Sequence, residues 1–199
     1  MMSVLSWLLG LLAVIALVPV SVFFLQMLLA CLPPRSRPLG TSVRPRVAVL
    51  VPAHDEAAII RATLASVTPQ LLPGDRLLVV ADNCTDDTAR LAREAGAEVV
   101  ERFDTVLRGK GYALDFGVRH LALQPPEVVI VVDADCQVAE GAIDCLARRY
   151  HQAQRPVQAL YLMRAPAGSG LKVQVAEFAW RVKNPVSYTH LTLPTILLV

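Results

Sequence analysis

Hydrophobic and polar residues divide the chain into an apolar N-terminal segment, a polar linker and a long stretch of short alternating patterns. Residues 4–32 contain no charged side chain in 29 positions. As a helix this run would be about 43 Å long, more than the roughly 30 Å of a bilayer core. No Lys or Arg precedes the run, and it is longer than the apolar part of a signal peptide. We therefore expect a transmembrane anchor over residues 1–32.

The linker is the segment PPRSRPLGTSVRPR, residues 33–46, and its proline and arginine content predicts a tether that is too polar to pack. It carries the basic residues Arg35, Arg37, Arg44 and Arg46. Because no basic residue precedes the apolar run, the positive-inside rule places the chain after residue 32 in the cytoplasm. The expected location is the cell inner membrane, with a single span in this chain.

From residue 47 onward, short β-branched and apolar runs alternate with stretches of helical spacing. Strands are expected at 47–51, 77–81, 97–101, 128–132 and 157–163. Helices are expected at 56–67, 85–96, 109–123, 139–153 and 171–184. In the second helix, Thr85 has the position of an N-cap and Gly96 that of a stop. Continuous apolar strands that alternate with helices predict an α/β fold, a Rossmann-like, mostly parallel sheet flanked by helices.

Composition narrows the functions that this fold could carry. A net charge of +2 and a charged fraction of 18% give no sign of a nucleic-acid partner. The cysteines, which are Cys31, Cys84, Cys136 and Cys145, form no CxxC pair and have no paired His spacing. The sequence therefore predicts neither a zinc site nor a disulfide framework.

Charged residues gather directly after the expected strands, which is where open parallel sheets bind ligands. The segment PAHDE (52–56) follows the first strand, and Asp82 follows the second. The segment RGKG (108–111) opens the third helix, and DAD (133–135) follows the fourth strand. We therefore expect acids and one cationic, glycine-flanked loop on a single edge of the sheet.

Asp133 and Asp135 have two interpretations. They can end the apolar strand as a solvated turn. Alternatively, side chains at i and i+2 of an extended segment share a side, so both carboxylates can reach one divalent cation. Carboxylate oxygens suit Mg²⁺ or Mn²⁺, and the position at the end of a buried parallel strand favours the metal.

The remaining polar residues of this edge also have two interpretations each. Asp82 can cap a turn, or accept N–H donors from a nucleobase. Glu56, with Asp55 as its competitor, can accept ribose hydroxyls or cap the first helix with its charge. Lys110, between two glycines at a helix start, can bind a diphosphate together with backbone N–H groups. These residue types together match a binder of a nucleotide diphosphate.

The segments VAVLVPAHDE, VVADNCTDDTARLAREAGAEV, RGKGYALDFG and VVDADC resemble glycosyltransferase family 2, whose members have the GT-A fold. The similarity covers residues 47–186, and the four segments follow the family's order and approximate spacing. The resemblance implies that Asp82 contacts uracil, that Lys110 lies near the diphosphate, and that the two DAD aspartates form the metal-binding DxD motif. It also implies inverting, metal-dependent transfer of a sugar from a UDP-sugar to a lipid or polysaccharide acceptor at a membrane.

The candidate residues follow from both lines of argument. Nucleotide-sugar binding is assigned to Pro52, Ala53, Glu56, Asp82, Lys110 and Asp133. Metal binding is assigned to Asp133 and Asp135, with Mn²⁺ or Mg²⁺ as the cofactor.

Two features depart from the family's pattern. After Asp144 the only acid is Glu177, within an amphipathic segment, and we expect the catalytic base to lie beyond residue 199. The last segment, SYTHLTLPTILLV (187–199), does not look like a continuation of the family, which predicts a foreign or truncated end to a domain over 47–186. The alternative function is therefore a non-catalytic, membrane-tethered nucleotide-binding module.

Overall fold

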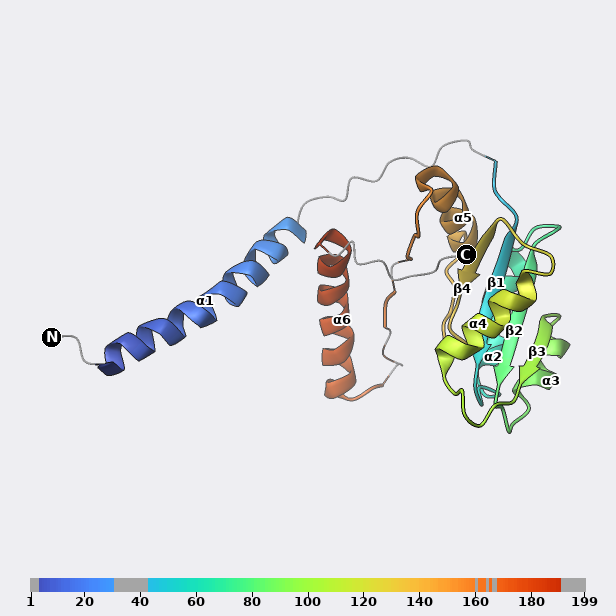
Figure 1. Cartoon of the computed structure of the whole chain (residues 1–199), viewed down its shortest axis with the longest axis horizontal. Coiled ribbons are helices and arrows are strands. Elements are labelled where there is room, and N and C mark those ends of the chain that lie inside the picture. The colour runs from blue at the N-terminus through green and yellow to red at the C-terminus, as the bar shows by residue number, and fades with distance from the viewer. Residues whose placement is uncertain (1–3, 31–42, 160, 164, 166–167, 191–199) are drawn as a thin grey trace. The chain divides into compact units, whose positions relative to one another are not determined.

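The structure is a computed structural model that describes residues 4–30, 43–159, 161–163, 165 and 168–190. The chain divides into two compact units. One unit contains the helices α1 (Val4–Ala30) and α6 (Leu171–His190). The other contains a sheet and the remaining helices (Figure 1).

Helix α1 confirms the apolar helix predicted at the N-terminus. Its window Ser6–Leu25 has a mean hydropathy of 2.8, so it is long and apolar enough to cross a membrane. Pro19 lies inside this helix, where it removes one backbone hydrogen bond. The first part of the expected linker, residues 33–42, and the last part of the expected atypical tail, residues 191–199, lie outside the described residues.

The sheet consists of the strands β1 (Val47–Ala53), β2 (Arg76–Asp82), β3 (Glu98–Arg102) and β4 (Val128–Val131). All are parallel, in the order β3-β2-β1-β4. Strands β1 and β2 are buried along almost their whole length, which confirms the reading of continuous apolar runs as central strands.

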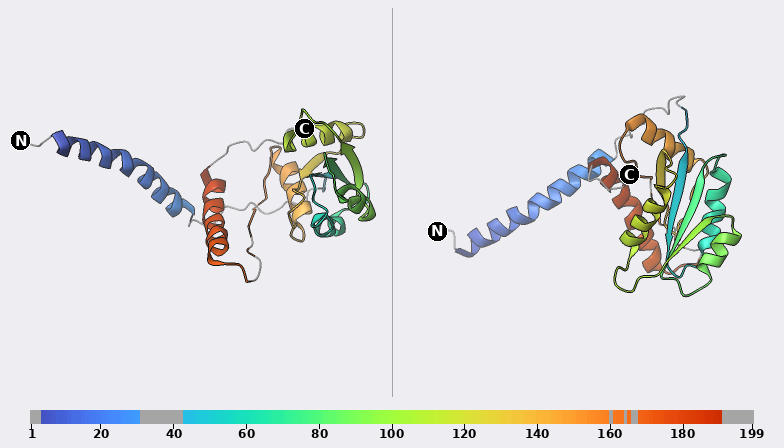
Figure 2. Two further views of the ribbon diagram at one scale, coloured as in Figure 1. Left: turned by 90° about the horizontal axis from the view of Figure 1, so that it is seen from below. Right: turned by 45° about the vertical axis from the view of Figure 1, so that its right-hand side comes forward.

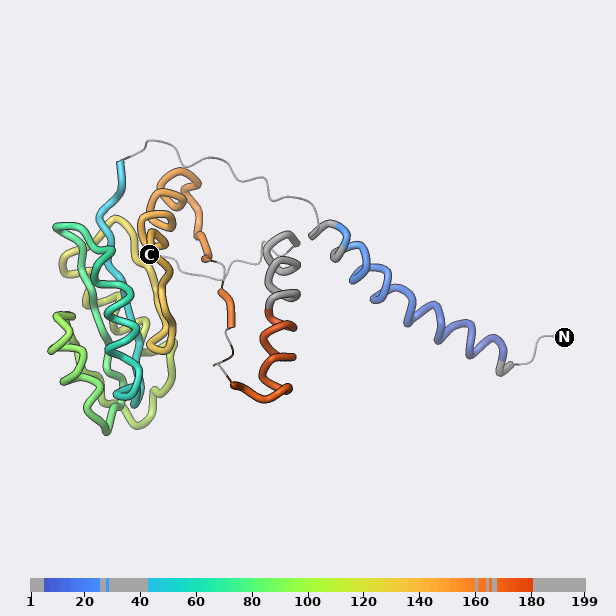
Figure 3. Tube along the Cα trace, turned by 180° about the vertical axis from the view of Figure 1, so that it is seen from behind, coloured from blue at the N-terminus to red at the C-terminus, as the bar shows by residue number. Residues whose placement is uncertain are grey.

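Helices cover both faces of the sheet. On one face lie α2 (Ile60–Val67), α3 (Thr88–Glu94) and α5 (Ala142–Ala153), and a 3₁₀ turn, η1 (Thr68–Gln70), extends α2. On the other lies α4 (Lys110–Leu121). Figure 2 shows the strands between these layers, and Figure 3 shows the face that α2 and α5 cover. The side chains of β1 alternate between the two resulting apolar clusters, as the pleat of a strand requires.

Helices α2, α3 and α5 begin three or four residues later than the sequence predicts, and α5 begins at Ala142 instead of residue 139. Helix α3 begins at Thr88, and Thr85 is not its N-cap, because the Thr85 hydroxyl bonds to the carboxylate of Asp55 and the N–H of Thr88 bonds to the carboxylate of Asp86. Helix α2 begins at Ile60 instead of residue 56, because a turn in which Glu56 O accepts the N–H groups of residues 59 and 60 precedes it. Gly96, with φ of +84°, follows the end of α3 as expected.

The prediction of a strand at 157–163 was wrong for the residues that the structure describes there. Residues 157–159 and 161–163 belong to no strand. An apolar, β-branched run becomes a strand only where a neighbouring strand pairs with it. Here Tyr161 instead packs edge-to-face on Trp180 of α6, with ring centroids 5.7 Å apart.

The end of the expected linker packs on the domain, contrary to the prediction for 33–46 as a whole. The guanidinium of Arg44 lies 2.7 Å from the carboxylate of Asp75, and both side chains are almost fully buried. Asp75 also accepts the N–H groups of Val47 and Leu72. Burial raises the pKa of the Asp75 carboxyl, but Arg44 and the two N–H groups outweigh it, so the net shift of the pKa is downward.

The close approach of α4 to the sheet depends on Gly117. A Cβ atom at this position would lie 2.5 Å from a methyl group of Leu50 and 2.9 Å from one of Val80. Both neighbours are fully buried side chains of the central strands, so they have little room to move.

We predict that Gly117→Ala lowers the free energy of unfolding by about 1–2 kcal/mol, because overpacking costs more than the gain in helix propensity. Urea unfolding followed by circular dichroism measures this. The control is Gly111→Ala in the same helix, where an added Cβ meets no atom within 4 Å. A control as destabilising as the test variant would contradict the packing argument.

Asp75→Asn should lower the free energy of unfolding at pH 7 by about 3 kcal/mol, because it removes the buried partner of the Arg44 charge and leaves only the partly exposed Asp144, 3.4 Å away. The folded pKa of Asp75 lies below its ordinary value of 3.8. Its contribution is therefore present above that value and is lost as the pH falls through the folded pKa. Denaturant midpoints between pH 7 and pH 2.5 should fall less steeply in the variant. Asp115→Asn, which removes an exposed pair with Arg119, should change the midpoint little.

Candidate functional site

A cleft opens beside the point at which the strand order reverses, between β1 and β4. Strand β1 pairs with β2 as far as Ala53 and Ala81, but with β4 only as far as Leu50 and Val131, where β4 ends. This reversal is the switch point at which open α/β sheets bind ligands. The cleft has a volume of about 560 Å³. It is lined by Pro52, Ala53, His54, Glu56, Asp82, Asn83, Arg108, Gly109, Lys110, Ala113, Asp133, Ala134 and Asp135.

The loops after β1 and β2 bind each other through two aspartates. The carboxylate of Asp55 accepts the N–H groups of Thr85, at 2.6 Å, and of Asp86. In return, the carboxylate of Asp86 accepts the N–H groups of Ala57, at 3.0 Å, and of Thr88, at 2.9 Å. Asp55 takes a left-handed conformation, with φ of +53°, to make these bonds.

The two acids that the sequence left open for ribose differ in their positions. Asp55 uses its carboxylate to hold the neighbouring loop and does not line the cleft. Glu56 lines the cleft. Asp55, Cys84 and Asp86 also form a cluster with the spacing of metal ligands. Their acids are already hydrogen-bonded to backbone N–H groups, so the cluster has a structural explanation.

The base of the cleft contains a buried ion pair. Asp82, the last residue of β2, is 5% exposed, and its Oδ1 atom accepts a hydrogen bond of 2.6 Å from Nη1 of Arg102. The same oxygen accepts a bond of 3.0 Å from Nδ2 of Asn83. His54 also ties the strand ends together, because its Nδ1 donates to the carbonyl of Asp82 at 2.7 Å. The carbonyl can only accept, so Nδ1 carries the proton.

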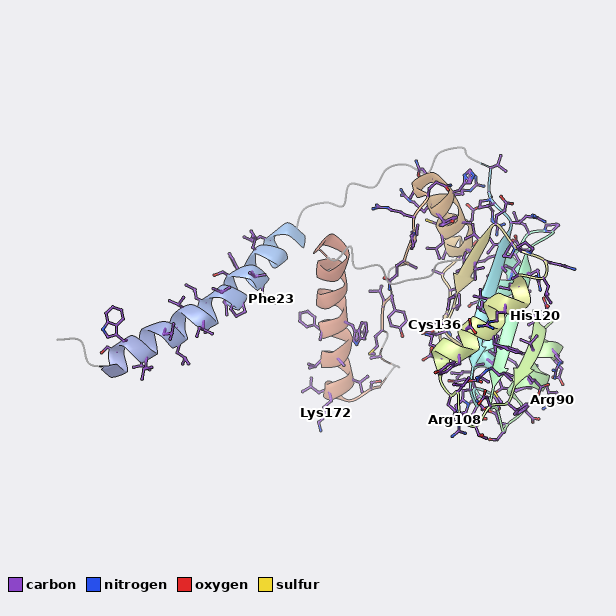
Figure 4. The ribbon with its side chains drawn as sticks, viewed as in Figure 1. Phe23, Arg90, Arg108, His120, Cys136 and Lys172 are labelled. Carbon is purple, nitrogen blue, oxygen red and sulfur yellow. The ribbon has the colours of Figure 1, made fainter. Side chains whose placement is uncertain are left out.

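Arg102 also shapes the loop that leads into α4. Its second guanidinium nitrogen bonds to the carboxylate of Asp104 and to the carbonyl of Leu107, and its charge lies 5.7 Å from the ring centre of Tyr112. Asp104 accepts the N–H groups of residues 106 and 107. The chain then turns at Gly109, with φ of +112°, so that α4 begins at Lys110. Figure 4 shows Arg108, in this loop, at the end of the sheet where the strands end.

The opposite wall of the cleft contains Asp133, Asp135 and the ammonium of Lys110. The carboxylates of the two aspartates and the thiol of Cys136 lie within 4.8 Å of one another. Lys110 Nζ forms an ion pair with Oδ1 of Asp133, and both side chains are about half exposed. The two carboxylates converge, although not by the route that the sequence argument used. The segment is a turn in which Asp133 O accepts the N–H of Cys136, and it is not an extended strand end.

The structure brings every candidate residue to one cleft. The candidates come from the ends of β1 and β2, from the loops after β1 and β4, and from the start of α4, and they lie up to 83 residues apart in sequence. Sequence reasoning missed Asn83 and Arg102, which hold Asp82. It also missed Thr63, whose hydroxyl donates to the carbonyl of Ala134 at 2.6 Å in the interior. Two features of the sequence could have pointed to them. Arg102 is a charged residue at the end of the third strand, and Thr63 is a polar residue among the apolar positions of the helix after the first strand.

Comparison with known proteins agrees with this geometry. Residues 48–173 match the model of the family described as glycosyl transferase family 2. The probable glycosyltransferase YdaM of Bacillus subtilis is 35% identical over 99 residues, which are 46% of this chain and 23% of that protein. The 4,4'-diaponeurosporenoate glycosyltransferase of Staphylococcus aureus is 34% identical over 106 residues, 51% of this chain and 27% of that protein. The chain thus aligns with about a quarter of the length of these relatives.

A solved structure extends the similarity to three dimensions. The mannosyltransferase PcManGT of Pyrobaculum calidifontis, in complex with GDP-Man and Mn²⁺, matches with a TM-score of 0.57 and 25% identity. The match covers 71% of this chain and 42% of that one. The parallel sheet, the cleft at its switch point and the family match lead to one conclusion: the chain belongs to glycosyltransferase family 2 and has its GT-A fold.

Proposed function

We propose that the cleft binds a UDP-sugar and that the protein transfers this sugar to a lipid or glycan acceptor at a membrane. The observation that carries the proposal is the gathering of Asp82, Lys110, Asp133 and Asp135 in one cleft at the switch point of the sheet. A nucleotide diphosphate requires an acidic side chain for its nucleobase, a cation for its phosphates and a pair of carboxylates for a metal. In the proposed inverting reaction, the bond between the anomeric carbon and the diphosphate breaks, the acceptor oxygen bonds to that carbon, and the hydroxyl proton passes to a general base; UDP leaves with the electron pair of the broken bond.

The chain's own groups assign a place to each part of the donor. Lys110 is the first residue of α4, so a diphosphate beside it meets both an ammonium and the positive end of the helix dipole. Glu56 is assigned to the ribose hydroxyls. Pro52 and Ala53, at the end of β1, are assigned to the floor of the site. In this arrangement the nucleobase lies at Asp82 and the diphosphate lies at Lys110 and the DAD turn.

The carboxylates at the metal end fit a hard divalent cation. Asp133 and Asp135 offer oxygen ligands within 4.8 Å of each other, and the ammonium of Lys110 bonds to only one oxygen of Asp133. Such ligands suit Mn²⁺ or Mg²⁺. The Mn²⁺ in the Pyrobaculum mannosyltransferase complex supports this choice. When bound, the cation would neutralise the diphosphate and stabilise it as the leaving group.

The hydrogen bonds of Asp82 favour uracil over guanine. Its Oδ1 already accepts from Arg102 and Asn83, whereas Oδ2 accepts no hydrogen bond from the part of the chain that the structure describes. One oxygen suits the single N3–H donor of uracil. Guanine presents two adjacent N–H donors, which match both oxygens of a carboxylate. We therefore assign UDP and not GDP to this cleft, although the Pyrobaculum relative is in complex with GDP-Man.

The membrane assignment rests on the first unit of the chain. Helix α1 is long and apolar enough to cross a bilayer, and arginines follow it in the sequence. We propose that it anchors the chain in the inner membrane with the sheet domain on the cytoplasmic side. A donor site tethered there suits an acceptor that is itself a lipid or a growing glycan.

The wild-type chain in detergent should bind UDP more tightly with Mn²⁺ than with EDTA, as measured by isothermal titration calorimetry. Asp135→Ala should abolish most of the Mn²⁺ effect, and Lys110→Ala should weaken UDP binding about 10-fold through loss of a charge-assisted contact. Arg119→Ala, an exposed cation on the same helix, is the control. Wild-type protein that binds no nucleotide would refute the proposal. Sugar transfer or UDP-sugar hydrolysis would exclude a purely binding module.

Asp82→Asn tests the assignment of the base. Arg102 and Asn83 both donate to Oδ1, so the amide oxygen of the variant should take this position and its NH₂ group that of Oδ2. The NH₂ group repels uracil N3–H but donates to cytosine N3. UDP affinity should fall about 10- to 100-fold while CDP affinity rises. Competition titrations with UDP, CDP and GDP measure this, and an unchanged order of affinities would contradict the assignment.

A further inference from the structure

The segment between β4 and α5 has no regular secondary structure, yet it carries both proposed metal ligands. It spans residues 132–141 and contains Asp133 and Asp135. An irregular segment has backbone N–H and C=O groups without ladder partners, and buried groups of this kind must find other partners. The partners of this segment show how the metal end of the cleft is built.

Three polar side chains of one short stretch, Thr63, Ser66 and Gln70, supply these partners. The Thr63 hydroxyl donates to Ala134 O at 2.6 Å, and Ser66 Oγ accepts the N–H of Val138 at 3.0 Å. Gln70 Nε2 donates to the carbonyl of Val138 at 3.4 Å. Its Oε1 accepts the N–H of residue 143, at the start of α5. We call these three side chains the polar ladder.

The ladder follows from the sequence spacing of α2 and η1. Positions three and four residues apart lie on one face of a helix, which places residues 63, 66 and 70 in a row. Each polar atom donates or accepts as its chemistry allows. Ser66 Oγ donates to the carbonyl of Thr63 and accepts from the N–H of Val138. Gln70 donates through its NH₂ group and accepts through its oxygen.

Thr63 is the ladder residue that bonds to the backbone between the two aspartates. It is 2% exposed, and its acceptor, Ala134, is 5% exposed and lies between Asp133 and Asp135. A buried carbonyl that loses its donor must move to find another. Because Ala134 is directly bonded to both aspartates, such a movement would displace both carboxylates.

We propose that Thr63 is a positioning residue for the metal site, and that the polar ladder holds the DAD turn so that both carboxylates reach one cation. This inference rests on the proposed function, in which Asp133 and Asp135 bind the metal. Thr63 contacts neither the donor nor the metal, and acts only through the backbone of Ala134. Groups that orient metal ligands in this way typically change metal affinity 10- to 100-fold when they are removed.

The test compares Thr63→Val, which keeps the shape and removes the donor, with Thr63→Ser, which keeps the donor. Calorimetry on the full chain in detergent gives the UDP affinity in EDTA and in Mn²⁺, and the ratio is the Mn²⁺ enhancement. Thr63→Val should reduce this enhancement about 10-fold while UDP affinity in EDTA stays unchanged. Thr63→Ser should keep the wild-type value.

Controls separate positioning from general loss of stability. Val67→Ala removes a fully buried side chain from the same helix without touching the ladder. It should lower the unfolding midpoint but keep the Mn²⁺ enhancement. Ser66→Ala gives a second ladder variant, with a smaller loss of enhancement, in case Thr63→Val does not fold.

Three outcomes would decide against the inference. Full Mn²⁺ enhancement in Thr63→Val would overturn it and leave the proposed function intact. An equal loss of enhancement in Val67→Ala would show that the effect is only one of stability. Wild-type protein that binds UDP equally well with and without Mn²⁺ would overturn the metal assignment, and the inference with it.

Discussion

The position of β1 between β2 and β4 is the constraint on which the site depends. After β1 the chain crosses to β2 and then to β3, and only then returns across the sheet to β4. The carboxyl ends of β1 and β4 are thus neighbours in space but 78 residues apart in sequence, counted from Ala53 to Val131. The strand order reverses between β1 and β4, and the cleft forms at the carboxyl ends of these strands, where open α/β sheets bind ligands.

Two ion pairs at the ends of this cleft differ in the ease with which they can rearrange. Arg102 and Asp82 are both about one-tenth exposed, and separating a buried pair is costly. Lys110 and Asp133 are about half exposed, and an exposed pair contributes little to stability. The end of the cleft that contains Asp82 is therefore fixed in the folded protein. At the other end, Lys110 can exchange its carboxylate partner for a diphosphate at little cost, which suits a site that must admit and release a charged ligand.

Local patterns predicted much of this arrangement, and tertiary pairing decided the rest. Apolar runs located the four strands, their carboxyl ends located Asp82 and the DAD aspartates, and a glycine-flanked helix start located Lys110. The partners of these residues could not be predicted, because Arg102 is 20 residues from Asp82, and Thr63 is 71 residues from Ala134. The same limit explains the strand expected at 157–163, since a sequence run does not show whether a strand lies beside it. Thr85 had the signature of a cap, but the Asp86 carboxylate accepts the N–H of Thr88 at the start of α3, and the Thr85 hydroxyl bonds to Asp55.

Helix α2 links the two ends of the cleft mechanically. It begins four residues after Glu56, which lines one end of the cleft. Its polar ladder reaches the DAD turn at the other end. Its apolar face, with Ile60, Leu64 and Val67 fully buried, fixes the helix to the sheet. A shift of α2 would therefore move Glu56 and the DAD turn together, and their separation would be kept. In the proposed function that separation must match the length of a nucleotide diphosphate, and a single rigid helix sets it more precisely than two independent loops would.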